Sequence, residues 1–161
     1  MVKYLTLIIP LIFLGCNLNS QNVVKPEKFD FEKISFNAVS KNLVLENLED
    51  ETDMNNMKNI TKYWFDNKIK TNGLDGSLTV GVKNIDISKS KYEEYFKISI
   101  NLVIEFKEEG NSSSRIKIYN IKASEFGEIK GSFSIADQEI LVLNIMHQAL
   151  NSVSKKIIEL N

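Results

Sequence analysis

Residues that could carry nucleophilic or acid–base chemistry are scarce in this chain, which has one cysteine, Cys16, and one histidine, His147. A Ser-His-Asp or Cys-His arrangement around His147 remains formally possible. His147 directly follows Met146, which belongs to an apolar seam with helical spacing. We therefore expect His147 at the boundary of a packed helix and assign it no catalytic role.

The acidic residues do not suggest a reaction centre either. Zinc sites need several histidine or cysteine ligands, and the acidic run 49–53 lacks the glycine and the terminal glutamate of an EF-hand loop. The neighbouring carboxylates Glu93-Glu94 and Glu108-Glu109 would point to opposite faces of a strand. We expect a protein that is not an enzyme and uses no metal or cofactor. A hydrolase that works with carboxylates alone is the weaker alternative.

The first sixteen residues have the layout of a secretory signal peptide. Lys3 precedes an apolar run from Tyr4 to Leu14, and the small residue Gly15 follows it. The run is shorter than the roughly 20 residues that a membrane-spanning helix needs, and Pro10 lies inside it. The segment therefore predicts export of the chain.

Leu14-Gly15-Cys16 resembles the lipobox of bacterial lipoproteins, in which a small residue precedes an invariant cysteine. Phe13 stands where that class usually has an aliphatic residue. The resemblance implies cleavage before Cys16, with lipid on its sulfur and on its new amino group. Lipidation also accounts for an unpaired cysteine in an oxidising compartment. The alternatives are an uncleaved signal and an inner-membrane anchor.

The rest of the sequence is typical of one folded domain. We expect a signal peptide over 1–15, the lipidated cysteine and a flexible tether over 16–30, and a single domain over 31–161. The chain has 20 basic and 21 acidic residues, and hydrophobic residues make up 43% of it. This balance, without a basic stripe, gives no electrostatic reason to bind nucleic acid.

Alternation of apolar and polar residues predicts four strands. The clearest covers 96–106, where every second residue is large and apolar. Three more strands are predicted over 31–45, 78–87 and 115–123. The alternation slips after Ala38, which indicates a bulge or a break between two short strands, and it slips again at Asn84.

Apolar residues that recur every three or four positions predict two helices. The first covers 54–71 and ends before Gly73, a residue type that often ends helices. The second follows Ser134, which can form a capping box with Asp137, and runs to about Leu160.

The order of these elements predicts the fold class. Polar turns are expected at 89–91 and between Gly127 and Gly131. The order is then β-α-β-β-β-α, which favours an α+β fold: a four-stranded, mainly antiparallel sheet with two helices packed on one face.

Trp64, Ile69, Gly73 and Gly76 resemble a short segment of small uncharacterised alphaproteobacterial envelope lipoproteins. The element order is also similar to that of two better-known groups. One is the lipopolysaccharide-assembly lipoprotein of the outer-membrane translocon, and the other is the auxiliary lipoprotein of lipid-trafficking ABC transport systems. A similar order of elements does not fix function. The resemblance therefore implies no functional residue beyond Cys16.

Two functions are compatible with these observations. The first is a non-enzymatic lipoprotein, bound to the membrane through Cys16, that supports an envelope assembly or transport complex and has an envelope protein as its partner. Asn17 replaces the aspartate of inner-membrane retention signals, which implies the inner leaflet of the outer membrane, facing the periplasm. The alternative is a binding module for lipid or another apolar ligand, because Ile140–Ile145 give the second helix surplus apolar surface next to the sheet. An exposed apolar patch would favour the first function and an enclosed cavity the second.

Overall fold

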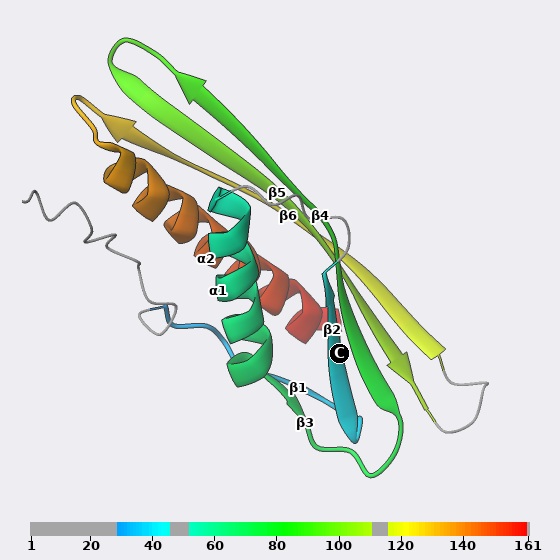
Figure 1. Cartoon of the computed structure of the whole chain (residues 1–161). Coiled ribbons are helices and arrows are strands. Elements are labelled where there is room, and N and C mark those ends of the chain that lie inside the picture. Colours follow the sequence, from blue (N-terminus) through cyan, green and yellow to red (C-terminus); the bar gives the residue numbers. More distant parts are fainter. Residues whose placement is uncertain (1–28, 46–51, 111–115, 161) are drawn as a thin grey trace, which may run out of the picture.

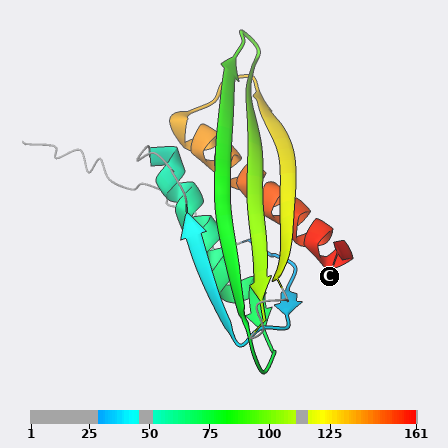
Figure 2. The same cartoon turned by 90° about the vertical axis from the view of Figure 1, so that its right-hand side faces the viewer.

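The computed structural model describes residues 29–45, 52–110 and 116–160, which form an α+β domain (Figure 1). Two helices, α1 (Thr52–Lys68) and α2 (Ile135–Leu160), lie on one face of a four-stranded sheet. Within the part of the chain that the structure describes, the other face of the sheet carries no helix (Figure 2). The predicted fold class is confirmed.

The sheet combines three long strands with one short one. In sheet order they are β2 (Ser40–Leu45), β4 (Ser77–Lys91), β5 (Tyr95–Glu109) and β6 (Ile116–Lys130). β2 runs parallel to β4, whereas β4, β5 and β6 are antiparallel neighbours. A separate parallel pair joins β1 (Ile34–Phe36) to β3 (Ile69–Thr71). The segment 31–45 is therefore broken into two short strands, as the slip after Ala38 predicts.

β5 shows how the sequence assigns side chains to the two faces. Its even-numbered residues from Phe96 to Phe106 are all buried beneath the helices, because side chains alternate between the faces of a strand. In β4 the register shifts between Val82 and Asn84. This shift returns the next apolar residue, Ile85, to the buried face.

Three predicted boundaries are wrong. α1 ends at Lys68 instead of residue 71, because Ile69–Thr71 pairs with β1. β4 continues through 89–91, and β6 continues to Lys130. Gly127 therefore lies within a strand and faces Ile98 of β5 instead of marking a turn. Partners distant in sequence determine the structure of Ile69–Thr71 and of the end of β6, whereas residues 89–91 pair with the start of β5 across a short turn.

A buried polar link joins the two helices in the described part of the core. Trp64 of α1 is fully buried, and its Nε1 donates to Oγ of Ser154 in α2 at 3.0 Å. Ser154 Oγ in turn donates to the carbonyl oxygen of Leu150 at 2.9 Å. The indole also meets the ring of Phe106 edge-on, at 6.3 Å between centroids. The two helices are thus joined by buried polar groups that are all satisfied.

α2 is positioned by its first residues and by a close approach to β6. The predicted capping box is confirmed, since Ser134 N donates to Oδ2 of Asp137 at 2.7 Å and Asp137 N donates to Ser134 Oγ at 3.2 Å. The Ser134 hydroxyl also donates to Oδ2 of Asp137, at 2.7 Å. This hydrogen bond and, after it, the one from Ser134 N lower the pKa of Asp137. Further along, a Cβ on Gly127 would come within 2.9 Å of Leu141 Cδ1. The missing side chain at Gly127 therefore lets α2 lie directly against β6.

Neither helix in the described part of the chain is both long and apolar enough to cross a membrane.

Candidate functional site

The described chain begins with an attachment to α2. Cys16, the predicted lipidation site, lies outside the described residues. The carbonyl oxygen of Asp30 lies 2.6 Å from Nε2 of His147 and 3.3 Å from Nδ2 of Asn151. The ring of Phe29 contacts the ring of His147, with 4.8 Å between centroids. The segment that leads from the N-terminal residues into the domain is therefore held on the helix layer.

His147 belongs to this attachment. Its ring lies near those of Phe29 and Phe31, the latter at 4.7 Å between centroids. A general base needs a nucleophile or an orienting carboxylate within hydrogen-bond reach. The hydrogen-bond partners that the structure describes for His147 are instead the Asp30 carbonyl and the Asn151 side chain. The geometry agrees with a structural histidine at the helix boundary.

One of the two carboxylate pairs lies in a strand, as predicted, and the other lies in a turn. Glu108 and Glu109 lie on opposite faces of β5, and Glu109 pairs with Lys107 at 2.6 Å. Glu93 and Glu94 are exposed in the turn between β4 and β5. Within 29–45, 52–110 and 116–160, no group of three or more potential metal ligands occurs. The described carboxylates do not assemble a metal site.

The surplus apolar residues at the start of α2 mostly join the core. Val142, Leu143 and Ile145 are buried, and Ile145 also lies within 3.2 Å of a Cβ built on Gly127. Ile140 remains 39% exposed. Packing on the sheet thus accounts for most of the apolar surface that suggested a ligand. The ligand-binding alternative stays a prediction.

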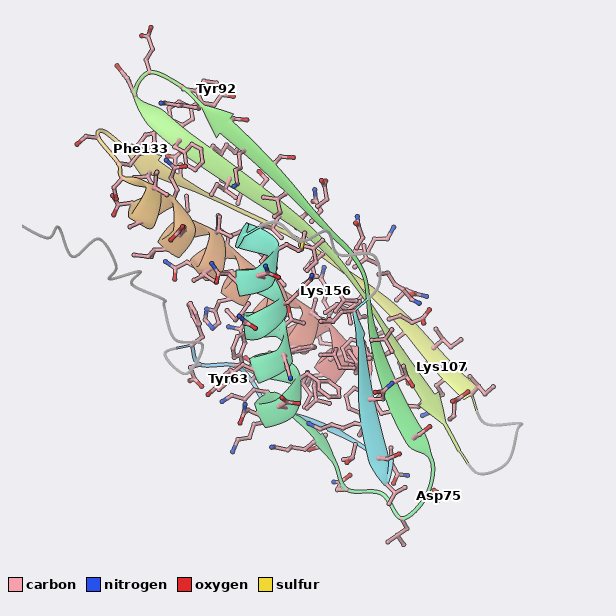
Figure 3. The ribbon with its side chains drawn as sticks, viewed as in Figure 1. Tyr63, Asp75, Tyr92, Lys107, Phe133 and Lys156 are labelled. Carbon is pink, nitrogen blue, oxygen red and sulfur yellow. The ribbon has the colours of Figure 1, made fainter. Side chains whose placement is uncertain are left out.

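An open cleft of about 780 Å³ lies at the tip of the β4–β5 hairpin. Figure 3 shows Tyr92 at this tip and Phe133 at the turn that leads into α2. The cleft is lined by Glu93, Glu94, Tyr95, Glu128, Lys130 and Gly131. Desolvation raises the pKa of Tyr95, and Tyr92, whose ring stacks on it at 4.3 Å, adds to the shift. Lys130 pairs with Glu128 at 3.3 Å. The cleft is open, and both polar and apolar groups line it, so the lining defines no ligand. We assign the cleft no chemistry.

The side of β6 that faces away from β5, which we call the β6 edge, is the longest edge of the described sheet. Lys156 of α2 reaches it, donating from Nζ to the carbonyl oxygen of Lys122 at 2.5 Å. One turn earlier, Ser152 Oγ donates to Oε1 of Glu125 on the buried side of β6, also at 2.5 Å. α2 therefore crosses beneath the strand and arrives at its edge. The helical spacing of Ser152 and Lys156 does not indicate which strand they contact. The sequence alone therefore did not identify the β6 edge.

Comparison with known proteins gives limited similarity. No family model and no curated sequence matches the chain. The chain is similar in structure to rare lipoprotein B from Shewanella oneidensis, with 10% identity, a TM-score of 0.44, and coverage of 75% of this chain and 95% of that one. It is also similar to a minor lipoprotein from Acinetobacter baumannii, with 10% identity and a TM-score of 0.41; the match covers 73% of this chain and 92% of that one. A third similar structure is the hypothetical protein CT253 from Chlamydia trachomatis, with 6% identity and a TM-score of 0.40; the match covers 78% of this chain and 95% of that one. TM-scores below 0.5 support no transfer of function, so the proposals below rest on the residues of this chain.

Proposed function

We propose that this chain is a non-enzymatic lipoprotein of the bacterial envelope, anchored through lipid on Cys16. The observation that carries the proposal is the sequence Leu14-Gly15-Cys16 after a charged start and a short apolar run, in a chain with no other cysteine. Asn17 favours the inner leaflet of the outer membrane, with the domain facing the periplasm.

The domain then acts as an accessory component that binds a protein of an envelope assembly or transport complex. His147, the single histidine of the chain, is hydrogen-bonded to the Asp30 carbonyl and packs against two phenylalanine rings. The described carboxylates form no group that could hold a metal ion. The long hairpin and the β6 edge instead offer surfaces for contact. A role in binding fits these features better than catalysis does.

Membrane fractionation of a Cys16→Ser variant tests the anchor. We expect the unchanged protein in the membrane pellet, labelled by a metabolic palmitate analogue, and the variant in the soluble periplasmic fraction without label. Asn17→Ser is the matched control and should remain lipidated and in the pellet. A Cys16→Ser protein that stays with the membranes would contradict the proposal.

A further inference from the structure

The β6 edge has backbone groups that no described strand uses. β6 is 15 residues long and is the last strand in the sheet order. Gly131 N donates to the carbonyl oxygen of Glu94 at 2.9 Å, which continues the β5–β6 ladder by one residue. The odd-numbered backbone groups therefore face β5, and the even-numbered ones face outward. Native proteins normally shorten, bend or cover an edge of this length.

α2 continues beyond this edge (Figure 2). Ser152 bonds to the buried side of β6, and Lys156, four residues later, bonds to its outer carbonyl. Leu160 is four residues further along the same face of the helix, because positions i and i+4 share a face. It is 57% exposed. Ser152, Lys156 and Leu160 therefore form a row along α2 that crosses β6. The row ends with the apolar side chain of Leu160, beneath the place where a fifth strand would lie.

We propose that the β6 edge accepts an extended segment of a partner protein as a fifth strand, seated on Leu160. Main-chain hydrogen bonds would supply affinity, and alternate side chains would supply specificity. For full pairing, Lys156 must leave the Lys122 carbonyl, and its ammonium then needs a new acceptor. The segment should therefore be extended, apolar opposite Leu160 and acidic close to Lys156.

A second copy of this chain fits the same edge less well. Pairing two β6 strands edge to edge would place each α2 beneath the β6 of the other copy. That space is already filled, because α2 packs against its own β6 at Gly127 and Glu125. A segment that brings no helix of its own avoids this collision.

This inference rests on the proposed function and specifies the surface that binds, the β6 edge, and the kind of partner, an extended segment of another protein. Its test uses the full chain purified in detergent and measures peptide binding, so its failure is distinct from failure of the anchor. The probe is a fluorescent nonapeptide of alternating valine and threonine, with a glutamate at each end. Two N-methylated forms carry the methyl groups on the valines or on the threonines.

Only one alternate set of peptide amides can face β6, so one methylated form should bind about tenfold more weakly and the other about as well as the parent. Leu160→Ser should also weaken binding about tenfold. Ile158→Ser is the matched control, because Ile158 is 45% exposed but lies on the opposite side of α2. It should leave binding unchanged.

Three results would overturn the proposal. The first is no binding of the parent peptide, and the second is equal binding by both methylated forms. The third is an equal loss of binding in the two serine variants. A protein that is dimeric without peptide, and that Leu160→Ser makes monomeric, would assign the edge to a second copy instead.

Discussion

The two edges of the sheet each carry a lysine that donates to backbone carbonyls, yet they are built differently. At the β2 edge, which has six residues, Lys41 Nζ lies 2.7 Å from the carbonyl oxygens of Phe65 and Ile69 and 3.1 Å from that of Asp66. At the β6 edge, Lys156 donates to a single strand carbonyl. Lys41 therefore ties a short edge strand to the end of α1, whereas Lys156 occupies one point on a long edge.

The two lysines differ in the kind of carbonyl group to which they donate. Carbonyls at a helix C-terminus have no partner within the helix, and a cation placed there also opposes the helix dipole. Lys41 stabilises the fold because it donates to such carbonyls at the end of α1. The carbonyl that Lys156 covers belongs to a row of similar groups that a strand could bind. Lys41 is thus committed to holding β2 against the end of α1, whereas Lys156 covers one carbonyl of an edge that is open to a partner.

Replacing Lys41 should have the largest effect on stability. Lys41→Met leaves three carbonyls without their charged donor, so the free energy of unfolding should fall by about 2 kcal/mol. Urea denaturation measures the change. Lys62→Met, on the exposed face of α1, should change it by less than about 0.5 kcal/mol. Equal losses in the two variants would remove the distinction between a structural lysine and a solvated one.

Gly127→Ala should have the next largest effect, because it tests the close approach of α2 to β6. The new Cβ would meet Leu141 Cδ1 at 2.9 Å, so we expect a loss of about 1 to 2 kcal/mol in unfolding free energy. Gly81→Ala in β4 is the matched control, since its Cβ would meet only the flexible Lys83 side chain, at 3.4 Å. Thermal denaturation should show Gly127→Ala as the less stable of the two. The reverse order would contradict the packing described here.

The pH dependence of Lys41 should give the smallest effect. Partial burial and, after it, the charge of Lys70 lower the pKa of Lys41 below its ordinary 10.5, while Asp66 opposes the shift. Between the folded pKa and 10.5 the unfolded chain binds more protons at this site, so its contribution to stability rises with pH. The difference in unfolding free energy between the unchanged protein and Lys41→Met should therefore grow as pH increases through that window. A difference that shrinks there would contradict the assigned shift.

Local patterns in the sequence predict most of the fold. The alternation over 96–106 gives β5, and the slip at Asn84 coincides with the shift in register of β4. The missed features depend on distant partners. Ile69–Thr71 continues the helical pattern, and only pairing with β1 makes it a strand. Gly127 looks like a turn residue until α2 is placed against it.

The candidate site was less predictable than the fold for the same reason. Lys156 and Leu160 are ordinary members of an amphipathic helix in the sequence. Their significance arises because α2 crosses β6 and emerges at its edge. Cys16 is the opposite case, since its role is inferred wholly from its sequence neighbours and stays a prediction.

Residue-resolved amide hydrogen exchange on β6 tests most directly whether this edge is open. Outward amides should exchange at least about a hundredfold faster than amides bonded to β5, because only the latter need the strand to open. The fast set contains Asn120, Ser124 and Phe126, and the slow set contains Ile121, Ala123 and Glu125. Such alternating protection is the predicted result. Equal protection of both sets would show that the β6 edge is already covered and would contradict the account.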